Sequence, residues 1–218
     1  MYNIAIDGPS GSGKSTLAKY ISKKLNILYL DTGAMYRACG LKAKKLGISP
    51  KDEEMVKTFI YDIDIKIEYK DGSQVTILDG EDVSQKIREN EVSMLASDIS
   101  ALQCVREKLV SLQREIALKQ SCVLDGRDIG TNVLPFAKYK FYVTASTAER
   151  TKRRQLELQN KGQFVDYDVL YKEIEQRDYN DSHREFAPLR QAEDAIFVDT
   201  SDMTIEQVID FVVSKIKE

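Results

Sequence analysis

The chain has little of several residue types on which particular folds and activities depend. Its 218 residues include three cysteines, one histidine, four prolines and no tryptophan. The cysteines, Cys39, Cys104 and Cys122, are far apart and form no Cys-x-x-Cys pair, which disfavours both a disulfide framework and a zinc cluster. A lone histidine, His183, is more typical of a surface or hinge position than of a catalyst. We therefore expect buried thiols and a chemistry that needs no imidazole.

The sequence also lacks a large excess of charge and any long apolar run. With 32 basic and 35 acidic residues, its net charge of -3 gives no general attraction to nucleic acid or to an anionic membrane. No window approaches the roughly 18 apolar residues of a membrane span, and residues 1–7 alternate like a strand instead of forming a signal peptide. We expect a cytoplasmic protein that starts at Met1, binds neither nucleic acid nor membrane, and meets anions with local clusters of cations.

Short apolar runs alternate with segments of helical periodicity, and this alternation predicts an α/β fold. The expected strands are 3–7, 27–30, 122–124, 141–143 and 196–199, and the expected helices are 17–25, 35–46, one or two within 92–116, and a last helix that Thr204 and Gln207 begin with a capping box. The period changes to two around Asp71-Gly72, which predicts an antiparallel hairpin over about 63–77. The fold class expected is a three-layer parallel sheet of about five strands with helices on both faces.

The change of periodicity also suggests how the domain is organised. We expect one domain over residues 1–218, with a core of 1–61 and 101–218, an inserted subdomain at about 62–100 and a short lid at about 150–165. No internal repeat or low-complexity linker is found.

The strongest motif lies between the first expected strand and the first expected helix. Residues 8–15, GPSGSGKS, match G-x-x-x-x-G-K-[ST], whose glycines turn backbone N–H groups toward phosphate oxygens while the lysine reaches the outer phosphates. The alternative is a glycine-rich turn that only connects strand to helix. The predicted ATP-binding residues are Gly8, Pro9, Ser10, Gly11, Ser12, Gly13, Lys14, Ser15 and Thr16.

A metal ion is expected beside this loop. The hydroxyl of Ser15 is suited to bind Mg²⁺, and Asp125, at the end of a later apolar strand, holds the place of an acidic residue that orients the metal's shell through water. The alternative role for Asp125 is that of a turn-forming aspartate.

The rest of the chain favours a small-molecule kinase among phosphate-loop proteins. The string Asn160-Lys161-Gly162-Gln163 lacks the final carboxylate with which switch GTPases recognise guanine, and motor or transporter ATPases usually have much longer chains. Several arginines suited to bind one anionic acceptor lie near strand ends or polar helix ends, although each is equally compatible with a solvated surface position: Arg37, Arg127, Arg177 and Arg184.

A second basic cluster precedes Asn160-Lys161-Gly162, and its members are Arg150, Lys152, Arg153 and Arg154. It suits a mobile lid that brings positive charge to the transferring phosphoryl group. A solvated helix face is the alternative.

Four segments taken together resemble the bacterial cytidylate kinase family. They are IDGPSGSGKS at 6–15, DTGAMYR at 31–37, DGRDIGT at 125–131 and RDYNDS at 177–182, followed by Arg184 and by APL at 187–189. The first segment is general to phosphate-loop kinases, whereas the second and third are specific in combination with the hairpin insertion. This insertion, at about 62–100, resembles the enlarged monophosphate-binding subdomain of the family. The resemblance covers nearly the whole chain.

The resemblance implies a role for individual residues. Thr32, Arg37, Arg127 and Arg184 are implied to contact the acceptor phosphate, Tyr36, Arg177 and Asp181 to surround its sugar, and Ser97, Arg106 and Asp128 to read cytosine. An arginine and a carboxylate complement the acceptors and the amino donor of cytosine. Lys14, Arg153 and Arg154 are expected to act in catalysis together with Asp125.

The implied activity is transfer of the ATP γ-phosphoryl group to CMP or dCMP, with Mg²⁺ as cofactor, by a monomeric enzyme. Two alternatives remain at this stage. One is a kinase for another monophosphate such as UMP or AMP, and the other is an ATP-dependent binding switch that phosphorylates no small molecule.

Overall fold

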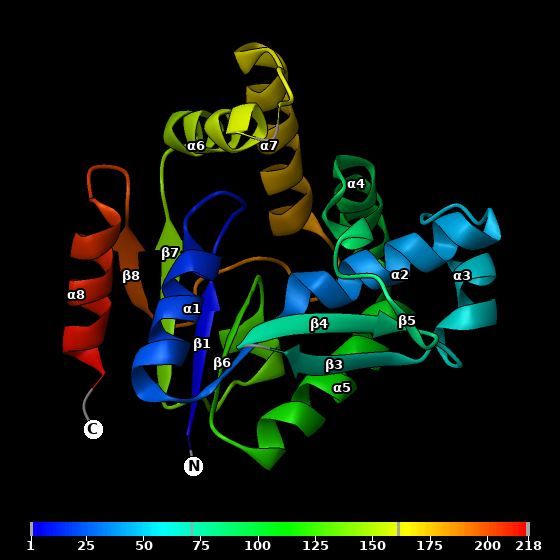
Figure 1. Cartoon of the computed structure of the whole chain (residues 1–218), viewed down its shortest axis with the longest axis horizontal. Helices are drawn as coiled ribbons and strands as arrows, with labels where there is room; N and C mark the ends of the chain where they lie inside the picture. The colour runs from blue at the N-terminus through cyan, green and yellow to red at the C-terminus, as the bar shows by residue number, and fades with distance from the viewer. Residues whose placement is uncertain (1, 71, 161, 217–218) are drawn as a thin grey trace. The chain divides into compact units, whose positions relative to one another are not determined.

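The computed structural model describes residues 2–70, 72–160 and 162–216, which form two compact units (Figure 1). The first unit comprises residues 1–29 and 120–218, and the second comprises residues 30–119. The expected subdomain of 62–100 falls inside the second unit. Asp71 of the expected hairpin turn and Lys161 of the expected lid lie outside the described residues. The division into core, insert and lid stays a prediction.

The first unit holds most of a five-stranded sheet in the order β2-β6-β1-β7-β8. Its elements are β1 (Asn3–Asp7), α1 (Lys14–Leu25), the start of β2 (Leu28–Asp31), β6 (Cys122–Gly126), the π-helical turn η2 (Ile129–Val133), β7 (Tyr139–Thr144), α6 (Thr147–Asn160), α7 (Tyr167–His183), β8 (Ile196–Asp199) and α8 (Ile205–Lys215). β1 pairs in parallel with β6 and β7, and β7 pairs in parallel with β8. The loops after these strands therefore emerge at one edge of the sheet, where α/β proteins bind their ligands.

The core of the first unit lies between one face of the sheet and two helices, α1 and α8 (Figure 1). Alternate residues of the strands, such as Ile4 and Ile6 of β1, are fully buried there against Leu17 and Ile21 of α1. At about 25 cal/mol for each Å² of apolar surface removed from water, each such side chain contributes roughly 1.5–3 kcal/mol. This packing fixes the direction in which β1 enters the glycine loop.

The second unit combines helices with a three-stranded antiparallel sheet in the order β3-β4-β5. Its elements are α2 (Thr32–Leu46), α3 (Glu53–Ile60), β3 (Ile65–Lys70), β4 (Ser73–Leu78), β5 (Glu81–Asp82), the 3₁₀ turn η1 (Lys86–Arg88), α4 (Asn90–Ile99) and α5 (Gln103–Lys119). α2 packs closely on α4. A Cβ at Gly40 would lie 3.1 Å from the backbone nitrogen of Ala96, so this contact depends on a residue without a side chain.

The fold class predicted from the sequence is confirmed, as are its expected strands and hairpin. The last helix also begins as predicted, because Thr204 accepts a hydrogen bond from the backbone N–H of Gln207, whose side chain accepts from the N–H of Thr204. The three cysteines are buried free thiols, and burial raises the pKa of Cys122 to about 12. None of the described helices is long and apolar enough to cross a membrane.

Candidate active site

The glycine loop at the end of β1 has a backbone conformation that only glycine adopts easily. Gly8, Gly11 and Gly13 have φ angles of 146°, 75° and 90°, in the region that side chains disfavour. A Cβ on Gly8 would stand 1.9 Å from the carbonyl oxygen of Val143 on β7, so no other residue fits there. The loop leads directly into α1, whose first N–H groups have no partner within the helix and suit an anion.

Lys14, the first residue of α1, is folded back into this loop and is only 5% exposed. Its ammonium group donates to the carbonyl oxygen of Pro9 at 2.6 Å and to the hydroxyl of Ser12 at 3.4 Å. Burial, and after it the positive charge of Arg127, lowers the pKa of Lys14 to about 7, although three nearby carboxylates act in the opposite direction. A cation close to a second cation in a water-poor region is suited to bind phosphate groups.

Ser15, which follows Lys14 on α1, is hydrogen-bonded to Asp125 at the end of β6. The hydroxyl of Ser15 donates to one carboxylate oxygen of Asp125 at 2.6 Å, and the phenol of Tyr29 donates to the other at 3.0 Å. Asp125 and Tyr29 are both more than nine-tenths buried. The carboxylate is therefore held in a fixed orientation with respect to the serine hydroxyl.

Arg150, the buried member of the basic cluster on α6, is hydrogen-bonded to the glycine loop. Its guanidinium donates to the carbonyl oxygens of Ala145 at 2.9 Å and Ser10 at 3.1 Å, and to the hydroxyl of Thr147 at 2.9 Å. It also forms an ion pair with Asp178 of α7 at 2.5 Å. With these four partners, Arg150 connects the glycine loop to α7 and has a structural function.

The two members of the cluster predicted to be catalytic lie one helical turn further along α6. Arg153 donates to the carbonyl oxygen of Thr200 at 2.7 Å and to its hydroxyl at 3.0 Å. That hydroxyl also lies 3.3 Å from the carbonyl oxygen of Ser12, so Arg153 reaches the glycine loop through Thr200. Arg154 forms an ion pair with Glu157 on its own helix at 2.8 Å.

Five predicted acceptor-binding residues lie on the first unit, after β6 and along the end of α7: Arg127, Asp128, Arg177, Asp181 and Arg184. Arg127 donates to Asp181 at 2.8 Å, and Arg184 lies 3.4 Å from Asp128. Burial by itself raises the pKa of Asp181, but the positive charges of Arg127 and Arg177 hold this pKa below its usual value. Within this unit the structure therefore brings Arg127 to Asp181 and Arg184 to Asp128, and the predicted contacts of these residues with an acceptor stay a prediction.

The other five predicted acceptor-binding residues belong to the second unit: Thr32, Tyr36, Arg37, Ser97 and Arg106. Arg37 forms an ion pair with Asp31 at 2.8 Å, and Asp31 caps α2 through the N–H of Ala34. The guanidinium of Arg106 is 1% exposed, lies 5.3 Å from the ring centre of Tyr36, and donates to the carbonyl oxygen of Ser100 at 3.1 Å. Ser97 lies on α4 and is half-buried.

Comparison with known proteins identifies the family. A sequence profile described as cytidylate kinase matches residues 4–218. The chain is 54% identical over 207 residues to the cytidylate kinase of Caldicellulosiruptor bescii, covering 95% of this chain and 92% of that protein. It is 46% identical over 215 residues to the cytidylate kinase of Syntrophotalea carbinolica, covering 99% and 92%. The chain belongs to the cytidylate kinase family.

Solved structures with low sequence identity share the fold of this cytidylate kinase family member. A gluconokinase from Sinorhizobium meliloti superposes with a TM-score of 0.50 at 11% identity, covering 98% of this chain and 90% of that one. An uncharacterised protein from Eubacterium ventriosum superposes with a TM-score of 0.53 at 14% identity, covering 98% and 97%. These similarities concern the fold alone.

The residues around Asp125 fit a Mg²⁺ ion that is also bound by nucleotide phosphates. A hydroxyl and a carboxylate supply the oxygen ligands that Mg²⁺ prefers, and Mg²⁺ usually keeps several waters and takes the remaining ligands from substrate phosphates. Among the described residues, no group of three or more acidic, histidine or cysteine side chains is arranged to hold a metal by itself. The donor set of Ser15 and Asp125 thus suits a metal that arrives with the nucleotide.

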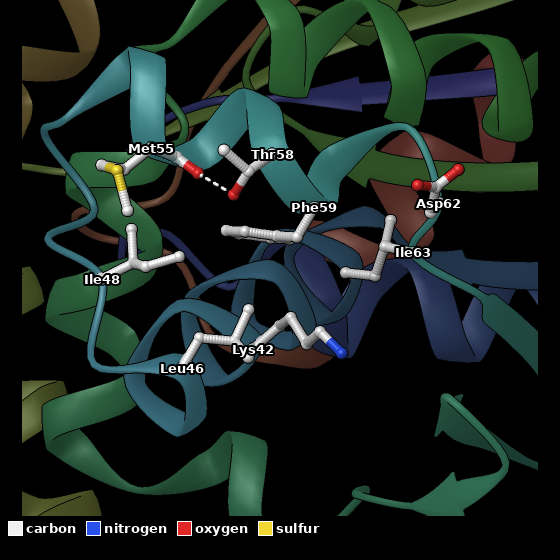
Figure 2. A pocket seen from close by; sticks show the side chains of 8 residues that line it. All are labelled: Lys42, Leu46, Ile48, Met55, Thr58, Phe59, Asp62 and Ile63. Carbon is white, nitrogen blue, oxygen red and sulfur yellow. Dashed lines mark hydrogen bonds between the residues drawn. The ribbon is translucent and has the colours of Figure 1, made fainter.

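A surface hollow of about 450 Å³ in the second unit is separate in character from the phosphate-binding residues (Figure 2). Its lining is mainly apolar and contains none of the predicted site residues: Lys42, Leu46, Ile48, Met55, Thr58, Phe59, Asp62 and Ile63. Figure 2 shows the hydroxyl of Thr58 turned back to its own helix, where it donates to the carbonyl oxygen of Met55 at 2.6 Å. The hollow offers no cluster of cations for a phosphate.

Sequence reasoning missed three residues that orient the site, namely Asp7, Tyr29 and Thr200. Each acts through a partner more than 90 positions away in the chain, as in the bond from Tyr29 to Asp125. Only Asp7 carries a local signal, because a carboxylate at the end of a short apolar strand is costly to bury without partners. The bonds made by Tyr29 and Thr200 have no such signal in the sequence.

Proposed function

We propose that the chain catalyses transfer of the γ-phosphoryl group of ATP to CMP or dCMP, giving ADP and CDP or dCDP. The observation that carries this proposal is that β1 and β6 pair in parallel with Asp7 opposite Gly126, so the ATP-type glycine loop with buried Lys14 and the turn with Arg127 leave the sheet at the same edge. Besides burial, the charge of Arg127 also lowers the pKa of Lys14. Cations from a donor loop and from an acceptor turn thereby face one phosphate-binding region. Membership of the cytidylate kinase family agrees with a nucleoside monophosphate as acceptor.

The chemistry proposed for this region is alignment and charge neutralisation. An oxygen of the acceptor phosphate forms a bond to the γ-phosphorus, the bond to the bridging oxygen of ADP breaks, and that oxygen keeps the electron pair. No general base is needed, because the second pKa of a phosphate ester is about 6 and the attacking oxygen is mostly ionised at neutral pH. His183 is exposed at the end of α7, where it stacks on Tyr179, in agreement with this view.

Lys14 is assigned to the outer phosphates of ATP, and Arg153 and Arg154 are assigned to the charge that develops on the transferring group. Support for the latter two comes from α6, which begins beside the glycine loop through Arg150 and Ser10. Ser15 and Asp125 would hold Mg²⁺, which when bound neutralises charge on the β- and γ-phosphate oxygens. We expect little ATP hydrolysis without an acceptor.

The acceptor contacts follow the roles implied by the family resemblance. We assign the acceptor phosphate to Thr32, Arg37, Arg127 and Arg184, the sugar to Tyr36, Arg177 and Asp181, and cytosine to Ser97, Arg106 and Asp128. A buried guanidinium such as that of Arg106, oriented by a backbone carbonyl, is a suitable donor to the ring N3 and O2 of cytosine. We further propose that the enzyme is cytoplasmic, in agreement with its buried free thiols, and that it is a monomer, as the family resemblance implies.

A coupled assay of ADP release with CMP, dCMP, UMP and AMP tests this function. We expect turnover with CMP and dCMP, and a loss of about 100-fold or more in kcat for Lys14→Ala. Lys23→Ala is the matched control, because Lys23 is an exposed lysine on the same helix. Equal turnover of CMP and AMP would contradict the cytosine assignment, and full activity of Lys14→Ala would contradict the role of the glycine loop.

A further inference from the structure

Asp7 is a buried carboxylate at the junction between β1 and the glycine loop, and the proposed chemistry gives it no task. It is the last residue of β1, is 5% exposed, and lies in register with Gly126 of β6. Both of its oxygens are used. One accepts a hydrogen bond from the backbone N–H of Ile129 at 2.7 Å, and the other accepts from the N–H of Gly130, also at 2.7 Å.

These two N–H groups belong to the first residues of the π-helical turn η2. The first N–H groups of any helical turn have no acceptor within it and are normally satisfied by the side chain of the residue just before the turn. That residue is Asp128, which makes no such capping bond. Its two oxygens instead lie 2.9 Å from the side-chain nitrogen of Asn132 and 3.4 Å from the guanidinium of Arg184.

Capping of this turn has therefore been transferred to a residue 122 positions away in the chain. Gly130 makes the transfer possible, since a Cβ there would lie 3.3 Å from an oxygen of Asp7 and 3.2 Å from the side chain of Lys140. If Asp128 capped the turn itself, its carboxylate would be directed to the backbone N–H groups and away from Arg184. In the observed arrangement Asp7 caps the turn and Asp128 contacts Arg184.

We propose that Asp7 is a positioning residue for acceptor recognition: by capping η2 from β1, it leaves the carboxylate of Asp128 oriented toward Arg184 and the bound monophosphate. This inference rests on the proposed function, in which Asp128 and Arg184 contact the acceptor. It assigns Asp7 to the acceptor side of the reaction, although Asp7 directly precedes the loop that binds ATP.

The test compares Asp7→Asn, Asp7→Ala and the wild type in steady-state kinetics and in amide hydrogen exchange. Asp7→Asn keeps the shape of the side chain and one of two acceptors, so it is the variant to rely on where Asp7→Ala fails to fold. We expect the KM for CMP to rise about tenfold in Asp7→Asn and more in Asp7→Ala, with the KM for ATP within threefold of the wild type. Exchange at the amides of Ile129 and Gly130 should accelerate in both variants.

Asp52→Asn is the control for loss of a capping carboxylate as such, because Asp52 caps α3 through the N–H of Met55 at 3.1 Å. It should leave both KM values unchanged. A KM for CMP within twofold of the wild type in Asp7→Asn, or an equal rise in the KM for ATP, would overturn the inference. Failure of the wild type to phosphorylate CMP would instead defeat the proposed function, and the exchange measurement would still report whether Asp7 caps the turn.

Discussion

The ionisation of Asp7 should make the stability of the protein fall as the pH rises from about 4 to 7. Burial raises the pKa of Asp7 from 3.8 to about 7, the charge of Asp128 raises it too, and the two backbone hydrogen bonds and Lys14 oppose the increase. Between these pH values the folded state keeps a proton that the unfolded state has released. The folded state is therefore favoured at the acidic end, and this advantage is lost as the pH passes 7.

The interval of about three pH units, at about 1.4 kcal/mol per unit, corresponds to roughly 4 kcal/mol of free energy of unfolding. Because Asp7 is nearly completely buried, solvent screening removes little of this value. The quantity to measure is the difference between the wild type and Asp7→Asn, in which groups that do not interact with Asp7 cancel. Lys14 and Asp7 shift each other's pKa, so the difference reports Asp7 together with its effect on Lys14. Asp7→Asn itself replaces the carboxyl group with an amide whose oxygen can accept from only one of the two N–H groups.

Urea unfolding at pH 4.5, 5.5, 6.5 and 7.5 provides the assay. The free energy of unfolding of the wild type minus that of Asp7→Asn should decrease by about 3–4 kcal/mol across this series. A difference that stays constant within about 0.5 kcal/mol would mean that Asp7 is ionised in the folded protein at every pH tested. The two backbone hydrogen bonds would then outweigh burial, and the reasoning would be refuted.

Three further substitutions test the packing around the site and in the core. Gly8→Ala places a Cβ 1.9 Å from a carbonyl oxygen of β7 and should lower the melting temperature several times more than Gly47→Ala. A Cβ at Gly47 meets open space, so that substitution costs only the backbone strain of about 1–2 kcal/mol. Equal shifts in melting temperature would contradict the close approach of Gly8 to β7. Tyr29→Phe removes one hydrogen bond from Asp125 and should raise the Mg²⁺ concentration for half-maximal rate a few-fold. It should also lower the free energy of unfolding in urea by about 1 kcal/mol. An unchanged Mg²⁺ dependence would count against the metal assignment. Gln113→Met removes a fully buried amide whose atoms find no hydrogen-bond partner among the described residues. It should raise the free energy of unfolding by about 1–3 kcal/mol. A decrease in this free energy would show that the amide is hydrogen-bonded.

Most of the fold was accessible from the sequence because its elements depend on periodicity and on local turn chemistry. The apolar strands, the hairpin and the capping box of Thr204 all have signals within a few residues. α3 was missed although Asp52 caps it, since eight residues with three buried side chains give a weak periodic pattern. The turn η2 was missed for a different reason, because the residue that caps it comes from another strand.

The candidate site divides in the same way between local and distant determinants. The glycine loop with Lys14 is a contiguous motif, and each of its glycines is explained by the φ angle it adopts. The basic cluster of α6 is contiguous too, but its members have different partners. Arg150 donates directly to the carbonyl oxygen of Ser10 in the loop, whereas Arg153 reaches the loop through Thr200. Spacing on a helix places these side chains approximately, and only the packing of α7 and the loop after β8 decides what each one touches.

The charges around Lys14 explain why the site needs so many buried carboxylates. Lys14 and Arg127 repel each other, and each is desolvated, so holding both in place reduces the stability of the folded protein. Asp181 offsets this for Arg127, whose pKa stays above the ordinary value despite burial. In the proposed reaction, cations that the fold already orients would need no rearrangement as phosphate charge develops between donor and acceptor, which is the condition under which electrostatic stabilisation of a transition state is most effective. Substituting Lys14 should relieve the repulsion and stabilise the fold at the expense of turnover. Substituting Arg127 should not stabilise the fold, because it takes the ion-pair partner from the buried carboxylate of Asp181.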